Sequence, residues 1–464
     1  MAELAATADI PRGDRAFLGH PIGLAYLAFT EAWERFSFYG MQALLVLYMV
    51  DRLLRPGHME HIAGFGPVKG ALEAVLGPLS GQALASAIFG VYAASVYLTP
   101  LAGGLIGDRW IGRRAAVTLG AVLMAAGHFL MAFEWAFVGA LALLILGCGF
   151  LKGNIASQVG RLYGPDDPRR DDAFQIYVIA INVGVIAAPL VCGTLGELYG
   201  WHWGFTAAGV GMLIALCVYL AGGRYLPPDS PRARRAEGQA PKPPLTGRDW
   251  RAIVALTALI PILGLAFVGN NQIYNVYMIW ARDNADLVLM GWRAPVTWLQ
   301  SLDAFVSVAG LAVVALFWRV MAARKVVPSE LTKLTIGCGI AVLGFVDLAL
   351  AAAIQAHTGV KIPLLWLIAF HVINSIAYAN LLPVALSQFS RSAPPAVNAT
   401  MIGVFYLLFF MTNAMVGWIG GFYEKMGHVQ FWLLHAGLCA AAAAVLVLLH
   451  RPLKIALAPV EAEA

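Results

Sequence analysis

The sequence predicts an all-α membrane protein with twelve transmembrane helices, and three observations lead to this fold class. Charged residues make up 12% of the chain and hydrophobic residues 60%, with a mean hydropathy of +0.73, so a water-soluble surface could not be covered. The apolar residues gather into runs of roughly 20–30 residues, each long enough to cross a bilayer as a helix. Lysine and arginine are spread unevenly over the segments between these runs.

The twelve expected spans are separated by short polar segments, with one long proline-rich segment after the sixth span. They lie near 21–50, 83–106, 115–134, 136–160, 173–195, 203–223, 251–280, 296–318, 330–354, 362–387, 398–421 and 428–449. The expected domains are a cytoplasmic N-terminus at 1–20, an N-terminal six-helix bundle at 21–223, a cytoplasmic linker at 224–250, a C-terminal six-helix bundle at 251–450 and a cytoplasmic tail at 451–464.

Orientation follows from the basic residues, because cytoplasmic loops carry an excess of lysine and arginine. With the N-terminus inside, most of the 31 lysines and arginines fall on the cytoplasmic side. We therefore expect a multi-pass protein of the cell (inner) membrane with both termini in the cytoplasm and the connection 51–82 as an outer loop. The net charge of +5 is small and one-sided, so it does not indicate nucleic-acid binding. The five cysteines lie in apolar segments without metal-ligand spacing, and we expect no metal site.

Charged residues near the middle of the first span are the strongest functional signal. On a helix, Glu31, Glu34, Arg35, Phe38 and Gln42 fall within about 100° of arc. A charge at the centre of a membrane helix costs roughly 2.5–3.5 kcal/mol, so this face must line a protein interior or a wet cavity. A buried structural ion pair is the alternative, but two carboxylates beside one guanidinium favour a functional site.

A glycine-rich and basic motif joins the second and third spans. Two sets of six helices joined by a basic cytoplasmic linker resemble the major facilitator superfamily, and this motif resembles the loop signature of that superfamily. The resemblance implies a fold of two six-helix bundles, with a latch on the cytoplasmic side; the alternative is that the arginines only set orientation. The motif residues are Gly104, Asp108, Arg109, Gly112, Arg113 and Arg114.

Three further stretches, in order, narrow the resemblance to one family. They are the segment 31–40 with its Glu-x-x-Glu-Arg-Phe pattern, the segment 147–154, and the segment 174–189. Together they resemble the proton-dependent oligopeptide transporters, and the resemblance covers the N-terminal half of the chain.

The resemblance assigns roles to individual side chains in this half. It implies that Glu31, Glu34, Arg35 and Lys152 take part in proton coupling. It also implies that Arg35, Tyr39, Lys152 and Asn182 contact the substrate. The physical logic is separate, since two desolvated cations can bind a carboxylate while two glutamates balance them or bind protons. The alternative for Lys152 is a satisfied ion pair with Glu34.

Departures from the family pattern begin on the first helix and gather in the C-terminal half. Neutral side chains occupy positions that are usually aromatic hydroxyls, arginine, glutamates or tryptophan in the family: Phe38, Gln42, Asn270, Asn271, Tyr378 and Phe405. Both partners of the family's outer Arg–Glu pair are therefore missing together. We expect these six residues to line the substrate site of a re-tuned transporter.

Asp303 is a carboxylate where the family has an asparagine that contacts substrate. We expect it to bind the substrate amine, a proton, or both; the alternative is an aspartate paired with a helix dipole or a neighbouring amide. Asp347 and His128, which also lie in apolar segments, are expected to be structural.

The leading functional prediction is a proton-coupled secondary active symporter that imports di- and tripeptides by alternating access. Its expected partners are a small peptide-like zwitterion, protons and the lipid bilayer, with no cofactor beyond the coupling proton, and it is expected to act as a monomer. One alternative is a related proton-coupled or facilitative transporter for a non-peptide, modified-peptide or amino-acid-like substrate. The other is a non-transporting membrane receptor. An enzyme is not expected, because the chain has no HExxH, GxSxG or Walker motif.

Overall fold

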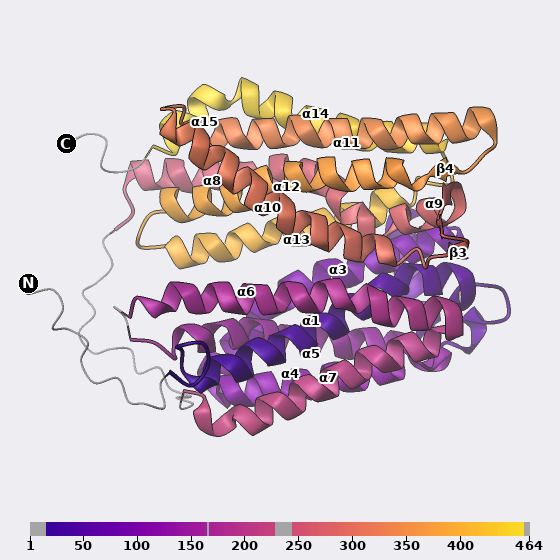
Figure 1. Ribbon diagram of the computed structural model, residues 1–464, viewed down its shortest axis with the longest axis horizontal. Helices are drawn as coiled ribbons and strands as arrows, with labels where there is room; N and C mark the ends of the chain where they lie inside the picture. The colour runs from indigo at the N-terminus through magenta and orange to yellow at the C-terminus, as the bar shows by residue number, and fades with distance from the viewer. Residues whose placement is uncertain (1–14, 165–166, 228–243, 459–464) are drawn as a thin grey trace, which may run out of the picture. The chain divides into compact units, whose positions relative to one another are not determined.

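The computed structural model describes residues 15–164, 167–227 and 244–458, and these residues are mostly helical (Figure 1). Ten of the described helices are long and apolar enough to cross a membrane. The other two predicted spans correspond to α1 (Ile22–Tyr48) and α4 (Arg113–Leu130). These two helices are less apolar than the rest because α1 carries three charged residues and α4 begins with two arginines. The predicted all-α fold class is confirmed.

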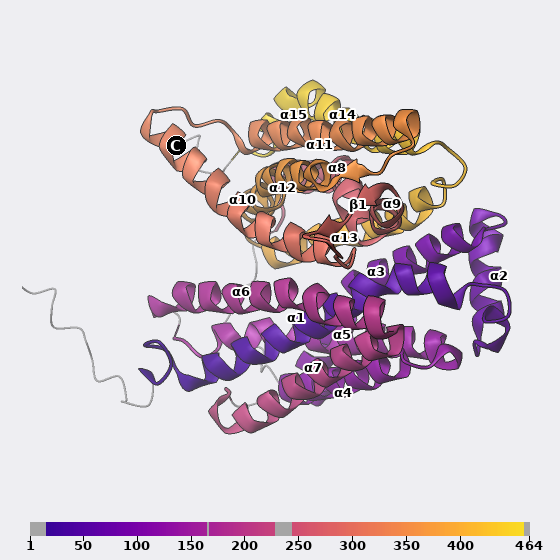
Figure 2. The ribbon, with the colours of Figure 1, turned by 45° about the vertical axis from the view of Figure 1, so that its right-hand side comes forward.

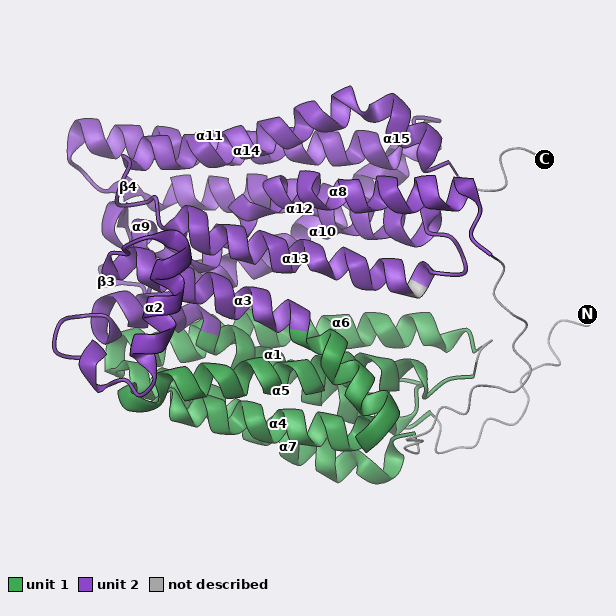
Figure 3. Cartoon of the chain, turned by 180° about the vertical axis from the view of Figure 1, so that it is seen from behind, with its two compact units in different colours: residues 1–41, 99–236 green, residues 42–98, 237–464 purple. Residues whose placement is uncertain are grey.

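The chain forms two compact units, coloured separately in Figure 3. Unit 1 contains residues 1–41 and 99–236, and unit 2 contains residues 42–98 and 237–464. This partition differs from the predicted division at the linker, because α1 and α3 (Gly81–Ile106) each contribute to both units. The division into two six-helix bundles stays a prediction, and most of the predicted linker lies outside the described residues.

Unit 1 is a layer of long helices, which Figures 1 and 2 show in indigo and magenta. Besides the first part of α1 and the last part of α3, it contains η4 (Gly107–Ile111), α4, η5 (Glu134–Ala136), α5 (Phe137–Gly160), α6 (Arg169–Ala188), η6 (Pro189–Gly193), η7 (Leu195–Tyr199), α7 (Trp201–Gly222) and η8 (Gly223–Tyr225).

Glycines let the helices of unit 1 approach backbone to backbone at two points. A Cβ on Gly103 would lie 2.2 Å from the carbonyl oxygen of Gly149, so α3 and α5 meet where neither has a side chain. A Cβ on Gly184 would lie 2.1 Å from the carbonyl oxygen of Ala32, so α6 meets α1 in the same way. Small residues at such contacts are a common device for packing helices within membranes. The first contact holds α5 against α3, and the second holds α6 beside the charged segment of α1.

Unit 2 holds most of the chain. It begins with the end of α1, η2 (Met49–Leu53), η3 (Met59–His61), α2 (Phe65–Leu76) and the first part of α3. It continues with α8 (Gly247–Asn271), η9 (Gln272–Tyr274), α9 (Val276–Asn284), α10 (Trp298–Ala323), α11 (Glu330–Thr358), α12 (Leu364–Ser392), α13 (Asn398–Gly420), α14 (His428–Leu448) and α15 (His450–Ala456).

Short strands join the ends of helices in unit 2. The strand β1 (Ala285–Asp286) pairs in parallel with β4 (Ile362–Pro363), and β2 (Val288–Leu289) pairs antiparallel with β3 (Trp292–Arg293). Gly291, with φ of 80°, supplies the positive φ that the turn between β2 and β3 requires.

The core of unit 2 lies along α8, where Leu256, Leu259, Leu263 and Phe267 recur at helical spacing and are fully buried. Large apolar side chains on α10 are exposed instead, including Phe305 at 63%. An apolar outer face is what a helix that borders lipid requires, since lipid cannot satisfy polar groups.

Two parts of unit 2 differ from the sequence prediction. The expected outer loop at 51–82 contains the helix α2, flanked by Gly64 and Gly77 with φ of 74° and 78°. The expected continuous span at 251–280 is broken at Asn275, whose φ of −127° and ψ of −112° separate η9 from α9. Hydropathy did not predict the helix α2 because its glycines and proline are typical of a loop. It did not predict the break at Asn275 because the apolar run continues through it.

The start of α3 packs closely on α13 within unit 2. A Cβ on Gly90 would lie 2.5 Å from the Cα of Gly417, so this contact exists because neither residue has a side chain. Nearby, the Ser86 hydroxyl donates to Asn275 Oδ1 at 3.0 Å, and Gln82 Nε2 donates to the Gly420 carbonyl oxygen at 3.1 Å.

Candidate functional site

The charged residues of α1 form one buried cluster in unit 1. Arg35 Nε lies 3.3 Å from Glu31 Oε1 and also contacts Glu34 Oε2. Glu34 is completely buried, and Glu31 and Arg35 are 5% and 6% exposed. The cluster is not fully satisfied, because Glu31 Oε2, Glu34 Oε1 and Arg35 Nη2 have no hydrogen-bond partner among the described residues. An incompletely paired buried cluster can accept a further proton or anion.

Phe38 brings a second cation to this cluster. The guanidinium of Arg35 lies 5.3 Å from the centre of the Phe38 ring, and Lys152 Nζ on α5 lies 4.7 Å from it. Both distances are within the range of cation–π attraction. Tyr39 packs edge-on against the same ring, with 5.2 Å between ring centroids. Arg35, Phe38, Tyr39 and Lys152 are thus brought together as the sequence suggested.

The helix α6 completes this part of the site. Tyr177 on α6 and Lys152 on α5 both interact electrostatically with the Glu31 carboxylate. Asn182, which the family resemblance placed in the substrate site, donates from Nδ2 to the Val178 carbonyl oxygen at 2.8 Å. This bond uses one of the two N–H groups of the Asn182 amide and leaves the other N–H and the amide oxygen outside it. The sequence analysis did not identify Tyr177, although a tyrosine within an apolar span of the matched segment 174–189 was a usable signal.

The remaining neutral side chains predicted for the site belong to unit 2. Gln42 and Asn271 each contain a buried amide atom without a partner among the described residues, Gln42 Oε1 and Asn271 Nδ2. Asn270 is half-buried one residue before Asn271. Tyr378 packs edge-on against Phe267, with 5.6 Å between ring centroids, whereas Phe405 is 1% exposed within the core of unit 2. Their predicted role in substrate binding stays a prediction.

Asp303 is held by a partner that the sequence analysis did not identify. Asp303 Oδ1 lies 2.9 Å from Nδ1 of His371 on α12, and His371 Nε2 lies 2.8 Å from the Tyr277 hydroxyl on α9. Tyr277 and His371 are fully buried, and Asp303 is 7% exposed. A histidine in the middle of an apolar span was the available signal, since ionisable residues at membrane depth are functional candidates by default.

A second missed interaction closes the end of α1 onto α9 within unit 2. Arg282 Nη1 contacts Asp51 Oδ2, and Arg282 Nε donates to Asp283 Oδ1 at 2.8 Å. Partial burial lowers the pKa of Arg282, but the hydrogen bonds and negative charges of Asp283 and Asp51 outweigh burial and raise it overall. This ion pair joins the segment that follows α1 to α9 within unit 2.

The loop motif after α3 is held together locally. Arg113 Nε donates to Asp108 Oδ1 at 2.5 Å, and Arg114 Nη2 donates to the carbonyl oxygen of Leu226, just after η8. Gly112 has φ of 84°, which explains the glycine at that position. Arg109 is exposed, and Gly104 packs near Gly153 of α5. The latch role stays a prediction.

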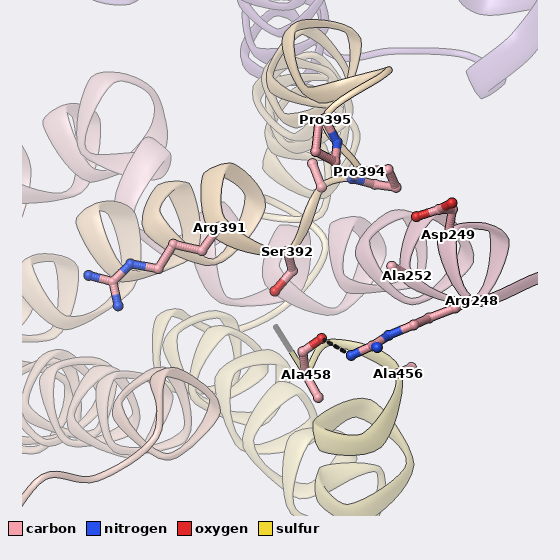
Figure 4. A pocket seen from close by; sticks show the side chains of 10 residues that line it. Arg248, Asp249, Ala252, Arg391, Ser392, Pro394, Pro395, Ala456 and Ala458 are labelled. Atoms are coloured by element: carbon pink, nitrogen blue, oxygen red, sulfur yellow. Dashed lines mark hydrogen bonds between the residues drawn. The ribbon is translucent and has the colours of Figure 1, made fainter. Parts of the chain in front are cut away.

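A cavity of about 360 Å³ opens elsewhere in unit 2, where α8 begins and α12 ends (Figure 4). Arg248 donates from Nη2 to the carbonyl oxygen of Ala458 at 3.2 Å across its edge. The described residues that line this cavity include Asp249 and Arg391 but none of the residues predicted for the substrate site.

The two residues expected to be structural show incomplete pairing. The two ring nitrogens of His128 and the Oδ2 atom of Asp347 have no hydrogen-bond partner among the described residues. His128 is fully buried within α4, where Gly127 packs on α5. Their assignment as structural residues stays a prediction.

Comparison with known proteins identifies the family. The model of the POT family matches residues 114–234 and 247–430. The chain therefore belongs to the POT family, as the sequence motifs predicted, and has the major facilitator fold.

Individual relatives match over nearly the whole chain. A protein of Yersinia enterocolitica named peptide transporter YePEPT is 29% identical, over 95% of this chain and 96% of the relative. A di-/tripeptide transporter of Lactococcus lactis subsp. cremoris is 27% identical, over 96% of this chain and 98% of the relative. The solved structure of a peptide transporter POT in complex with sulfate is 27% identical, with a TM-score of 0.80 over 96% of this chain and 97% of that chain.

Proposed function

We propose that this chain is a proton-coupled symporter that imports di- and tripeptides by alternating access. The observation that carries the proposal is the cluster in which Arg35 is flanked by two carboxylates while Arg35 and Lys152 share the Phe38 ring. Relatives named as peptide transporters support the substrate class. The proposed protein works as a monomer in the cell (inner) membrane with both termini in the cytoplasm. It uses protons as its coupling ion, needs no other cofactor, and carries out no catalysis.

Binding of a peptide carboxylate follows from the unsatisfied groups of the cluster. Arg35 Nη2 is buried and has no hydrogen-bond partner among the described residues. Lys152, on α5, lies near the same Phe38 ring as Arg35. A carboxylate placed between them gains charge-assisted hydrogen bonds, each worth about 1.5–3 kcal/mol. In the absence of substrate, Glu31 and Glu34 supply the negative charge that the two cations need.

Proton binding and carboxylate binding then favour one another. When Glu31 or Glu34 takes up a proton, the cluster loses one negative charge and Arg35 loses part of its pairing. The substrate carboxylate restores that charge, so protonation strengthens substrate binding and substrate binding strengthens protonation. Exchange of partners between these groups is also what alternating access requires. The membrane potential adds about 2.3 kcal/mol per charge at 100 mV to inward movement.

Transport in proteoliposomes tests this function. Purified protein under an inward proton gradient is expected to concentrate a labelled dipeptide such as dialanine above its external concentration, and to exchange it in counterflow without a gradient. Counterflow without accumulation would indicate a facilitative transporter. Dipeptide binding without either flux would indicate the receptor alternative.

One observation favours a second candidate, a transporter of non-peptide or amine-modified substrates. Asp303 is engaged by His371, while Asn270, Asn271 and Tyr378 are uncharged, so unit 2 offers an ammonium group fewer charges than the family pattern. Competition by N-acetyl-dialanine separates the two candidates. A peptide importer should prefer the free amine, whereas the second candidate should bind the acetylated compound at least as well.

A further inference from the structure

The hydrogen-bonded chain Asp303–His371–Tyr277 links three elements of unit 2 at membrane depth. The imidazole accepts or donates at both ring nitrogens, at 2.9 Å from the carboxylate and 2.8 Å from the phenol. Figure 1 shows α10 and α12, the helices that bear Asp303 and His371, next to each other, and the two helices are in contact. A further pair, Ser307 and Ser375 at 3.1 Å, lies one turn along both helices and keeps them in register.

The carboxylate is the accessible end of this chain. Asp303 is 7% exposed, whereas the side chains behind it are fully buried. Of the three side chains only Asp303 retains any exposure, so a ligand bound beside it would sense His371 and Tyr277 through the Asp303 carboxylate.

Amides without hydrogen-bond partners among the described residues lie on the same helix faces as Asp303 and His371. Gln300, three residues before Asp303, is 2% exposed, and neither its Oε1 nor its Nε2 has a partner among the described residues. Asn374, three residues after His371, is 3% exposed and its Nδ2 is likewise unpartnered. Residues three apart lie on one helix face. A buried amide without a partner destabilises the protein, and a polar ligand that pairs with it would remove that cost.

The hydrogen-bonded group Asp303–His371–Tyr277 has two charge states that differ by one proton. With a neutral imidazole, His371 donates from Nδ1 to Asp303 and accepts at Nε2 from the Tyr277 hydroxyl, and the chain carries one negative charge. With a protonated imidazole, His371 donates to both neighbours and the chain is neutral overall. An ammonium group is attracted by the first state and not by the second.

We propose that His371 is a proton-binding residue that sets the charge of an ammonium site at Asp303, so that a substrate amine and a proton compete for this site. The inference rests on the proposed peptide transport, because it assigns the site to the amino end of a peptide. Asp303 and the amide oxygen of Gln300 bind the ammonium, and His371 is a positioning residue that acts through Asp303.

Titratable groups on the packed elements define the electrostatic surroundings of the chain. Asp347 of α11 interacts electrostatically with Tyr277. His435 of α14 packs on Trp432 at 5.7 Å between ring centroids, and Trp432 in turn packs on Tyr277 at 6.3 Å. Among the described residues no hydrogen bond joins Asp347 to Asp303, His371 or Tyr277, and His435 Nδ1 is bonded to the Phe431 carbonyl oxygen at 2.8 Å. Neither replaces His371 between the carboxylate and the phenol.

The competition predicts a specific pH dependence. Protonation of His371 lowers the fraction of protein molecules that can bind an amine. Below the pH at which half of the His371 side chains are protonated, the apparent affinity for a free amine therefore falls by up to about tenfold per pH unit. By linkage, binding of an ammonium expels up to one proton. The opposite holds for the cluster on α1, where protons and the carboxylate bind together.

Comparison of two ligands isolates the site in unit 2. Dissociation constants of dialanine and N-acetyl-dialanine are measured with purified wild-type protein between about pH 5 and pH 7, where the α-amine of about pKa 7.7–8.0 stays charged. Effects of Glu31 and Glu34 act on both ligands and cancel in the ratio. The preference for dialanine should rise with pH by up to about tenfold per unit and then level off. Calorimetry in two buffers of different ionisation enthalpy should show extra proton release for dialanine.

Matched variants assign the effect to His371. His371→Asn keeps a donor near the Nδ1 position but cannot take up the proton, so the preference should stay high and independent of pH. His435→Asn makes the same change at a histidine whose Nδ1 is bonded to a carbonyl oxygen, and should behave as wild type. Tyr277→Phe removes the acceptor that stabilises protonated His371, so the midpoint should move to lower pH and keep the proposal testable if His371→Asn does not fold.

A wild-type preference that does not change with pH would overturn the inference, and so would an unchanged slope in His371→Asn or an unchanged midpoint in Tyr277→Phe. These outcomes leave peptide transport intact as long as dialanine is bound and accumulated. Failure of wild-type protein to bind either compound would overturn the proposed function and the inference together.

Discussion

The ammonium group of Lys152 lies 4.7 Å from the centre of the Phe38 ring, and this contact joins α5 to α1. The Arg35 guanidinium lies 5.3 Å from the same ring centre. The attraction between a cation and an aromatic face is worth about 0.5–2 kcal/mol and needs no anionic partner. The Phe38 ring therefore helps to keep two like charges near one another.

Replacement of this lysine tests the role of the second cation. Lys152→Ala should abolish proton-driven dipeptide uptake, down to the level of protein-free liposomes, because the substrate carboxylate loses one of its two cations. The control is Lys333→Ala, which removes a lysine held 5.4 Å from the Trp318 ring in unit 2 and should leave uptake near wild type. Wild-type accumulation by Lys152→Ala would rule out this assignment.

Neutralisation of the glutamates tests proton coupling. Glu31→Gln and Glu34→Gln should each lose accumulation under a proton gradient but retain counterflow, because exchange needs no net proton movement. Glu73→Gln changes a partly exposed glutamate of α2 that pairs with Lys69 at 4.0 Å, and should retain both activities. If both cluster variants still concentrate dipeptide, the coupling residues lie elsewhere.

Removal of the charge in unit 2 tests amine recognition. Asp303→Asn should weaken dialanine binding by roughly tenfold to a hundredfold relative to N-acetyl-dialanine, as expected for the loss of one charge-assisted hydrogen bond of about 1.5–3 kcal/mol. Asp347→Asn removes another carboxylate of unit 2 and should keep the wild-type preference. Equal binding of both peptides by Asp303→Asn and by wild-type protein would make Asp303 a structural partner of His371.

The ion pair at the end of the first span has a measurable coupling energy. A double-mutant cycle of Asp51→Ala and Arg282→Ala should give about 0.5–1.5 kcal/mol, since both side chains are partly buried, at 27% and 22% exposure. The free energy of unfolding in detergent supplies the four values. A parallel cycle on Glu330 and Arg391, whose arginine is 71% exposed, should give a value near zero. Equal coupling in the two cycles would show that the Asp51–Arg282 pair contributes no more than a surface contact.

Much of the fold was predictable from the sequence because hydropathy and basic residues act locally along the chain. Apart from 251–280, which is broken at Asn275, the predicted spans coincide closely with long helices, for example 330–354 with α11 at Glu330–Thr358. The helix α2 was missed because its short length and its glycines and proline resemble a loop. The partition of α1 and α3 between two units could not be predicted, since it depends on contacts between distant segments.

The site was predictable where its residues share one helix. Glu31, Glu34 and Arg35 lie within two turns, so their contact follows from helical geometry. His371 lies 68 residues from Asp303 and 94 from Tyr277, and Arg282 lies 231 from Asp51. No spacing rule predicts such pairs. The sequence analysis therefore found the acid at position 303 but not the group that holds it.

The contact of Gly90 with Gly417 has a consequence for conditions under which the protein is studied. Charge does not hold this contact, which depends on two absent side chains, so dissolved ions do not screen it. The Asp51–Arg282 pair lies in the same unit and is partly exposed, so its attraction weakens as ionic strength rises. In concentrated salt the contact between α3 and α13 is therefore expected to remain, while the Asp51–Arg282 ion pair between η2 and α9 weakens.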